Sequence, residues 1–190
     1  AYKMDRGKTV IAPSEQKYLR YKVTDDGISE RLIPGQKGFF YQDNSYEHIE
    51  DGHTTEEAQP RKDQVDKRNR KTETYLKTHF GAPTFFGDLE KSSAIFVSWG
   101  SMKGPIIEAQ KILKEKGIDT GFINFTHLFP MNKGMILPLF NDAKRYILVE
   151  NNSQGQFGKL LLMETGIEIK ERLLKYDGRP FLPEEIVEKV

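Results

Sequence analysis

The feature that most constrains the fold is a repeated strand–helix pattern from about Ala94 onward. The apolar runs AIFVSW, TGFINF and RYILVE each precede a segment with helical spacing. Strand starts recur about every 25 residues, which is the length of a strand–helix–strand unit with tight loops. The runs are nearly continuous rather than alternating, as is typical of strands covered on both faces. We therefore expect residues 88–190 to form a three-layer α/β/α domain with a mostly parallel sheet.

The spacing of apolar residues and glycines predicts the helices of this domain. Ile106, Ala109 and Leu113 share one face of a helix from Pro105 to Lys116, which ends at Gly117. Four further elements are expected: a short helix at 133–140, a helix at 156–165, a strand near 172–176 and a terminal helix from 183.

Residues 1–87 have a different character. The segments DDG and PGQKG are turn sequences, and the stretch is typical of a functional region or of an extension that packs on another chain. Residues 43–57 hold six acidic residues, whereas residues 61–77 hold seven basic and three acidic ones. We expect a helix that begins near Pro60. The favoured interpretation is a solvated helix, and the alternative is an arm that lies against another chain.

Composition excludes several classes of function. The chain has no cysteine, which excludes disulfides, a catalytic thiol and cysteine-ligated iron–sulfur clusters within it. A net charge of +1 gives no general reason to expect nucleic acid as a partner. No apolar run approaches the ~20 residues that span a bilayer, and the first residues lack an apolar signal core. We therefore expect a cytoplasmic location and no association with a membrane.

The segment WGSMKG connects a predicted strand to a predicted helix, a position where many proteins bind phosphate. It lacks the spacing of a P-loop or of a dinucleotide-binding turn, and Pro105 has no N–H group to offer. A structural turn is the favoured interpretation. Because ligands bind at the carboxyl ends of parallel strands, Ser101 and Lys103 remain candidate ligand contacts.

Two loops carry further candidate residues. His48, Glu50 and His53 are metal-ligand types, but their spacing is irregular, so we interpret them as residues that order an acidic loop. We expect no metal site there. Near the end of the chain, YDGRPFLPEEI places Arg179 on a rigid loop, where its guanidinium can meet a carboxylate of a neighbouring chain.

Six separated segments occur in a familiar order: RYKVTDDGISERLIPG, EHIEDGH, DKRNRK, SWGSMKGPIIEA, VENNSQGQFGKLL and KYDGRPFLPEEI. Together they resemble the C-terminal part of the alpha subunit of 2-oxoacid:ferredoxin oxidoreductases, most closely the 2-oxoglutarate type. The resemblance covers nearly the whole chain. It implies that residues 88–190 are related to the C-terminal domain of transketolase. Residues 1–87 are then the tail of the pyrimidine-binding domain, an extended arm and a charged linker helix.

Such enzymes cleave a 2-oxoacid with thiamine diphosphate, pass electrons through an iron–sulfur cluster to ferredoxin and form an acyl-CoA. The resemblance implies that thiamine diphosphate, Mg²⁺ and the cluster belong to the beta subunit, and that the substrate motif lies earlier in the alpha subunit. We therefore expect no catalytic, cofactor-binding or metal-binding residue in this chain, and no activity from it alone.

Two functions follow as hypotheses. The first is subunit assembly: the chain is a portion of the alpha subunit that packs against the beta subunit, and against gamma and delta subunits or domains where these exist. Ferredoxin would then interact with the assembled complex. The second is a regulatory α/β module that binds a small ligand or anion. The candidate residues for subunit contact or for the ligand edge are Tyr21, Arg31, His48, Ser101, Lys103 and Arg179.

Overall fold

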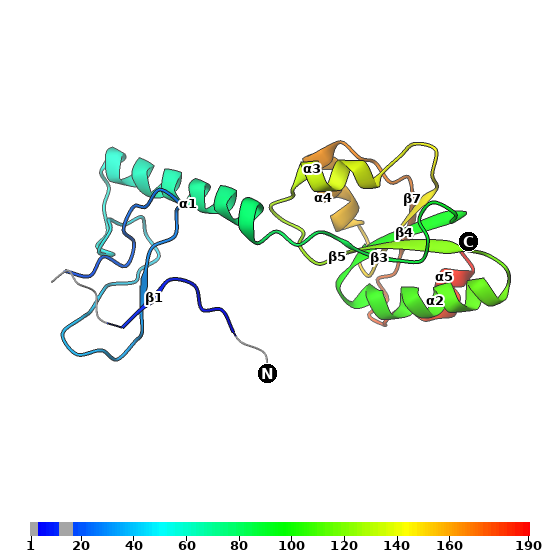
Figure 1. The fold of residues 1–190 in the computed structure, drawn as a ribbon, viewed down its shortest axis with the longest axis horizontal. Helices are drawn as coiled ribbons and strands as arrows, with labels where there is room; N and C mark the ends of the chain where they lie inside the picture. The colour runs from blue at the N-terminus through cyan, green and yellow to red at the C-terminus, as the bar shows by residue number, and fades with distance from the viewer. Residues whose placement is uncertain (1–3, 12–16) are drawn as a thin grey trace. The chain divides into compact units, whose positions relative to one another are not determined.

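The computed structural model describes residues 4–11 and 17–190, and its chain divides into two compact units. We call Ala1–His79 unit 1 and Phe80–Val190 unit 2. Each unit has its own arrangement of elements (Figure 1). Within the described residues, no helix is both long and apolar enough to cross a membrane.

Unit 2 is built on a five-stranded sheet with the order β3-β5-β4-β6-β7. The four strands from β5 to β7 in this order are parallel, and β3 is antiparallel to β5 at the edge. The strands are β3 (Thr84–Phe86), β4 (Ala94–Trp99), β5 (Thr120–Phe125), β6 (Tyr146–Glu150) and β7 (Glu171–Leu174).

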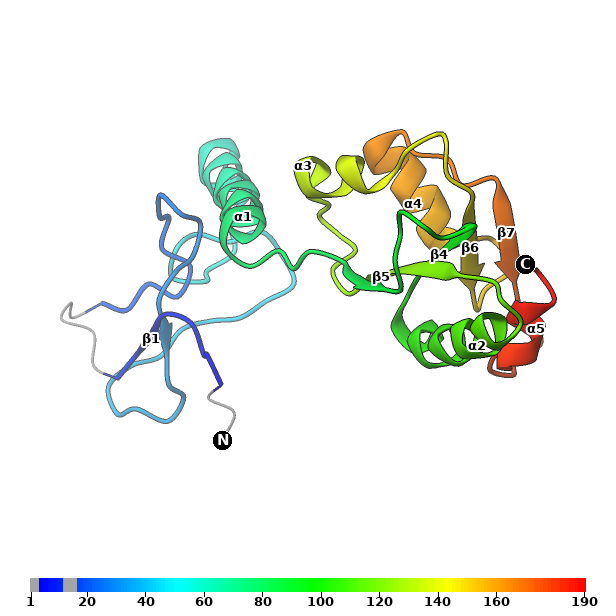
Figure 2. The ribbon, with the colours of Figure 1, turned by 45° about the vertical axis from the view of Figure 1, so that its right-hand side comes forward.

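Helices cover both faces of this sheet. Figures 1 and 2 show α2 and α5 on one face and α3 and α4 on the other. These helices are α2 (Lys103–Glu115), α3 (Lys133–Ile136), α4 (Gln156–Thr165) and α5 (Pro183–Val187). Short 3-10 turns, η1 (Gly100–Met102) and η2 (Leu137–Leu139), precede α2 and follow α3.

The alternating pleat of β4 explains why its apolar run is continuous. Phe96 packs into the core beneath α2 and α5, whereas Ile95 and Val97 pack into the core beneath α3 and α4. All three side chains are buried. The expected three-layer α/β/α class with a mostly parallel sheet is therefore confirmed.

Several element boundaries differ from the sequence prediction. The helix α2 begins at Lys103 rather than Pro105, because a proline in the first turn removes only an N–H group that has no helical acceptor. The last strand ends at Leu174 rather than Tyr176. Unit 2 also contains β3, which precedes residue 88 and pairs with β5.

Unit 1 has little regular structure besides one long helix, α1 (Ala58–Thr78). Two short strands, β1 (Thr9–Val10) and β2 (Arg31–Leu32), pair in parallel. Among the described residues of unit 1, only Tyr18 and Leu32 are buried hydrophobic side chains. As the turn-rich sequence indicates, this unit has few apolar anchors.

Polar side chains of α1 hold the preceding loop instead. Thr74 Oγ1 donates to the carbonyl oxygen of Asp26 at 2.8 Å, and Arg70 Nε donates to that of Thr24 at 3.1 Å. Gln64 also donates to the carbonyl oxygen of Tyr21 at 3.1 Å. These bonds satisfy backbone carbonyls that have no strand partner, so the loop follows the helix over several turns.

Candidate functional site

Three of the candidate residues meet in one cavity of unit 1. Tyr21, Arg31 and His48 all line a cavity of about 350 Å³ beside α1. The rings of Tyr21 and His48 are in contact, with their centroids 4.0 Å apart. The guanidinium of Arg31 donates to the carbonyl oxygen of Arg6 at 3.0 Å. We call this space the basic cavity.

The helix α1 supplies a wall that the sequence argument missed. Lys67, Arg68 and Lys71 line the basic cavity, and Lys67 and Lys71 are four residues apart on one helix face. Lys67 is only 7% exposed, and its ammonium donates to the carbonyl oxygen of Tyr21 at 2.8 Å. The basic run RKDQVDKRNRK is the sequence signal for this wall, although its charge by itself favours a solvated helix face.

The Lys67 ammonium is held in an unfavourable environment. Burial, followed by the nearby charges of Lys71, Arg20 and Arg68, lowers the pKa of Lys67 from 10.5 to about 8, and Glu50 acts in the opposite direction. Removing a charged ammonium from water without an anionic partner favours its neutral form. The cavity is therefore positively charged and incompletely neutralised.

Gly27 brings the DDG turn directly onto α1. Its φ angle is +74°, and a Cβ atom there would lie 2.3 Å from the backbone nitrogen of Lys71 and 2.5 Å from the carbonyl oxygen of Lys67. Glycine is required at this position both for its backbone conformation and for this close approach. The turn thereby forms one side of the basic cavity.

Two ion pairs lie at the margin of the basic cavity. Arg68 binds Glu47 through two hydrogen bonds of 3.1 and 2.6 Å, which lower the pKa of Glu47. Lys8 binds Asp26 at 2.5 Å. The hydrogen bond from Lys8, followed by the backbone N–H of Ile28, lowers the pKa of Asp26 from 3.8 to about 2.

The residues of the acidic loop are used in ordering that loop. Nδ1 of His48 lies 3.0 Å from the carbonyl oxygen of Ile49, and Nδ1 of His53 lies 3.0 Å from Asp51 Oδ1. Glu50 accepts from the backbone N–H of Val23 at 2.7 Å. Each of these side chains therefore has a local partner, as the loop interpretation expects.

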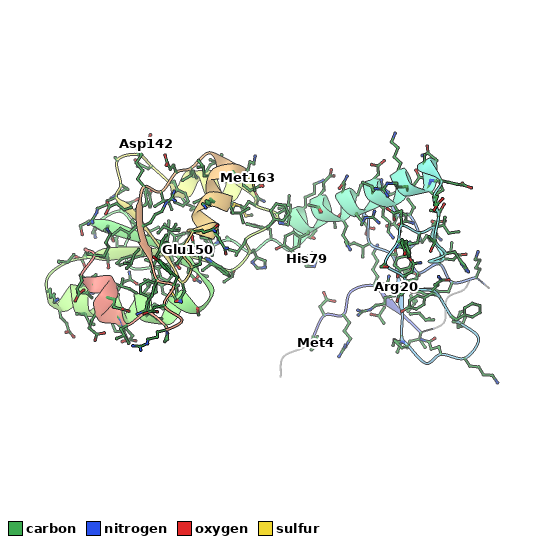
Figure 3. The ribbon with its side chains drawn as sticks, turned by 180° about the vertical axis from the view of Figure 1, so that it is seen from behind. Met4, Arg20, His79, Asp142, Glu150 and Met163 are labelled. Atoms are coloured by element: carbon green, nitrogen blue, oxygen red, sulfur yellow. The ribbon has the colours of Figure 1, made fainter. Side chains whose placement is uncertain are left out.

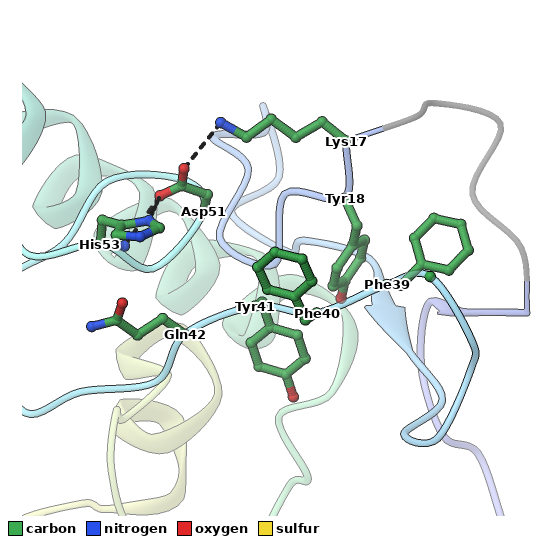
Figure 4. Close-up of a pocket in the computed structure, with 9 residues that line it drawn as sticks. Lys17, Tyr18, Phe39, Phe40, Tyr41, Gln42, Asp51 and His53 are labelled. Atoms are coloured by element: carbon green, nitrogen blue, oxygen red, sulfur yellow. Dashed lines mark hydrogen bonds and ion pairs between the residues drawn. The ribbon is translucent and has the colours of Figure 1, made fainter.

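A second cavity of unit 1, about 440 Å³, is lined by aromatic side chains (Figure 4). Asp51 lies at its margin and pairs with both Lys17 and His53 at 3.0 Å. One lining side chain, Phe40, is 87% exposed. The aromatic lining residues are Tyr18, Phe39, Phe40 and Tyr41. An exposed ring such as that of Phe40 is common at contacts between proteins.

The remaining candidates lie in unit 2. Ser101 and Lys103 are exposed at the turn into α2, and the Lys103 ammonium lies 5.2 Å from the centroid of the Phe86 ring. A cavity of unit 2, about 740 Å³, is lined by residues at the amino ends of β6 and β7 and not by this turn. Arg179 is exposed on the loop after β7, where its carbonyl oxygen accepts from Asn151 at 3.4 Å.

Glu150 is a structural residue that the sequence argument did not identify. It ends β6, is completely buried and is labelled in Figure 3. Its carboxylate accepts from the backbone N–H groups of Phe157 at 3.0 Å and Gly158 at 2.9 Å, and from the Asn152 amide at 2.6 Å. A carboxylate at the start of α4 satisfies N–H groups that have no helical acceptor. This site is therefore occupied by the protein's own carboxylate.

The chain offers no ligand set for a metal or a cluster in its described part. The sequence has no cysteine, and the described residues contain no group of three or more His, Cys, Asp or Glu side chains that could hold a metal ion. Iron–sulfur clusters require thiolate ligands, and Mg²⁺ requires carboxylates. We therefore assign no step of such chemistry to these residues.

Comparisons with known proteins agree with the fold. Residues 88–167 match the family model of the transketolase C-terminal domain, which identifies unit 2 as a domain of that class. Over almost its whole length, the chain is similar to alpha subunits of 2-oxoacid:ferredoxin oxidoreductases. The chain belongs to this family.

The similarity is substantial but concerns part of the relatives only. The alpha subunit of Saccharolobus solfataricus is 32% identical over 99% of this chain, and that of Aeropyrum pernix is 31% identical over 100%. The chain spans about 30% of the length of each. Among solved structures, a 2-oxoglutarate:ferredoxin oxidoreductase of Magnetococcus marinus has a TM-score of 0.77 and 25% identity, covering 94% of this chain and 31% of that one.

Proposed function

We propose that this chain is the C-terminal portion of an alpha subunit in an enzyme that oxidatively decarboxylates 2-oxoglutarate to an acyl-CoA and reduces ferredoxin. The observation that carries the proposal is the likeness to the Magnetococcus marinus enzyme over 94% of this chain. That structure contains 2-oxoglutarate, coenzyme A and succinyl-CoA. The curated relatives support the broader class of 2-oxoacids.

We further propose that residues 1–87 are the tail of the pyrimidine-binding domain with its arm and linker helix, and that this segment acts in subunit assembly. Its sparse apolar core supports this role, because a segment held mainly by polar bonds gains stability by burial against a partner. The exposed aromatic cavity around Phe40 supplies apolar surface for such burial. Thiamine diphosphate, Mg²⁺ and the iron–sulfur cluster would then be held by the beta subunit.

The substrate is tested with the full-length gene product, purified together with the subunits encoded beside it. Reduction of a viologen acceptor is measured with 2-oxoglutarate, pyruvate and a branched-chain 2-oxoacid, each with thiamine diphosphate and coenzyme A. We expect the highest kcat/KM for 2-oxoglutarate. A preference for pyruvate or for the branched-chain substrate would contradict that part of the proposal but leave the family unchanged.

Assembly is tested by hydrogen exchange on the 190-residue chain and on the assembled enzyme. We expect the amides of residues 1–60 to exchange quickly in the former and slowly in the latter, and residues 94–174 to be protected in both. Arg179→Ala should weaken assembly by about 1–3 kcal/mol if its contact is desolvated. Equal protection of residues 1–60 in both samples would exclude the interface.

A further inference from the structure

We propose that the basic cavity of unit 1 is a binding site for a phosphate-type anion, either inorganic phosphate or the phosphate group of a small metabolite. The site lies between α1 and the loop around Tyr21. Neither the similarity to the family nor the proposed catalytic function assigns a ligand to it. The proposal does not depend on which 2-oxoacid the enzyme oxidises.

The basic cavity carries a large excess of positive charge. Among its described lining residues, seven are lysine or arginine and none is acidic. Two of the seven are neutralised, since Arg68 pairs with Glu47 and Lys8 pairs with Asp26. In the described part of the chain, no carboxylate forms an ion pair with the other five: Arg6, Arg20, Arg31, Lys67 and Lys71. A converging set of unneutralised cations favours an anion with more than one negative charge.

Lys67 gives the second argument. Its ammonium has three donors, and the acceptor found for it is the carbonyl oxygen of Tyr21 at 2.8 Å. The residue is nearly buried yet lines the cavity, so an anion there would accept from its other donors. Burying an ammonium without an anion is unfavourable, and binding one would relieve the unfavourable burial. The lowered pKa of Lys67 has the same physical origin.

The walls of the cavity are held in place before any ligand binds. Gly27 packs on the backbone of α1, which fixes the loop on one side. On the other side, the Arg20 guanidinium lies 5.3 Å from the centroid of the Tyr21 ring and 6.0 Å from that of Tyr41. Figure 3 labels Arg20 in unit 1. A planar guanidinium positioned on aromatic rings can present two parallel N–H groups to phosphate oxygens.

A phosphate fits this arrangement better than a single carboxylate. Phosphate groups carry about 1.5 to 2 negative charges near neutral pH and offer three strong acceptor oxygens, whereas a carboxylate carries one charge. Lysine ammonium and arginine guanidinium groups are the usual phosphate ligands. The alternative is that an acidic protein segment occupies the cavity with its carboxylates. Succinate tests this alternative, because its two carboxylates carry about the same total charge as phosphate.

The experiment is isothermal titration calorimetry of the full-length gene product, assembled with its partners, at pH 7 and low salt. Inorganic phosphate, pyrophosphate and succinate are titrated separately. We expect one phosphate site per subunit, with succinate binding at least tenfold more weakly. Lys71→Gln, on the exposed side of α1, should weaken phosphate binding about three- to tenfold, and Lys67→Met about tenfold or more. Lys62→Met is the matched control on the same helix and should bind as the wild type does.

Proton uptake gives a second readout. The titration is repeated at pH 8 in buffers of different ionisation enthalpy. At this pH Lys67 is about half protonated, because its pKa is about 8. A bound anion raises this pKa, so binding should be accompanied by uptake of up to about half a proton. The groups that set this pKa are Lys71, Arg20, Arg68 and Glu50. At pH 6 Lys67 is already protonated, so no uptake by this side chain is expected. The protons that phosphate itself takes up or releases are measured with Lys67→Met and subtracted.

The outcomes that overturn the proposal are distinct. Phosphate binding that is unchanged in both Lys67→Met and Lys71→Gln would indicate an adventitious ion only. Equal binding of succinate would favour a carboxylate-bearing protein segment instead. Absence of binding in the assembled enzyme would show that the cavity is covered by protein. None of these results depends on whether the enzyme oxidises 2-oxoglutarate, so the proposed function is judged separately.

Discussion

The carboxylate of Glu150 accepts a 2.9 Å hydrogen bond from the backbone N–H of Gly158, eight positions later in the sequence. This bond joins the end of β6 to the first turn of α4 inside the core of unit 2. It places a buried negative group where the helix has unsatisfied N–H groups. The relationship explains how a fully buried glutamate is tolerated at the carboxyl end of β6, a strand inside the sheet.

Glu150→Gln should destabilise unit 2 by about 2–3 kcal/mol, because an amide NH₂ would face backbone N–H donors that now bind a carboxylate oxygen. Urea unfolding monitored by the fluorescence of Trp99, the single tryptophan, measures the loss. Glu168→Gln, at an exposed position, is the control and should change stability by less than about 0.5 kcal/mol. An unchanged midpoint for Glu150→Gln would contradict the role given to the carboxylate.

Two helical glycines should respond in opposite directions to alanine. At Gly158 a Cβ atom would lie 2.4 Å from Leu148 Cδ2, so Gly158→Ala should destabilise unit 2 by about 1–3 kcal/mol. At Gly104 a Cβ atom meets nothing within 4 Å, so Gly104→Ala should be neutral or stabilise α2 by up to about 1 kcal/mol. Thermal unfolding of both variants makes the comparison. A loss of stability in Gly104→Ala would contradict the open space and the helical backbone conformation described for Gly104.

Gly27→Ala should release the DDG turn from α1. The substitution combines a positive φ with backbone contacts of 2.3 and 2.5 Å, so the expected loss exceeds the roughly 1–3 kcal/mol of the φ strain alone. Gly7→Ala is a control with a similar φ of +68° but open space around the new methyl group. Hydrogen exchange of residues 20–30 measures the release. Similar exchange in both variants would mean that close packing at Gly27 contributes little.

Acid should weaken the contact between Lys8 and Asp26. The folded pKa of Asp26 is lowered to about 2 from 3.8, so its contribution is present above about pH 3.8 and is lost as the pH falls toward 2. Lys8→Met should raise the pKa of Asp26, although the backbone N–H of Ile28 still keeps it below 3.8. Carboxyl NMR titration measures the value. Lys77→Met should leave it unchanged, and an equal rise in both variants would indicate a general effect of charge.

Glycines and apolar patterning predicted much of unit 2. The run from Ala94 to Trp99 is apolar on both faces, which indicated a strand inside a covered sheet, and the structure confirms it. The limits of α4 were also predicted correctly, since Gly166 ends the helix with a φ of +81°. In contrast, β3 was missed because three residues carry no periodicity. Its pairing with β5 becomes visible only when the chain is folded.

The sequence by itself determined the α/β class, the order of most elements and the family, because these depend on local periodicity and on motifs that can be read in order. The basic cavity was decided by tertiary structure alone. Its walls join Tyr21 to Lys67, which are 46 positions apart, through a hydrogen bond to a backbone carbonyl. Charge in a sequence is a property of residues, whereas desolvation and the absence of a neutralising neighbour depend on what surrounds them in space. For that reason a basic run that indicated a solvated helix face contains, at Lys67, a nearly buried ammonium.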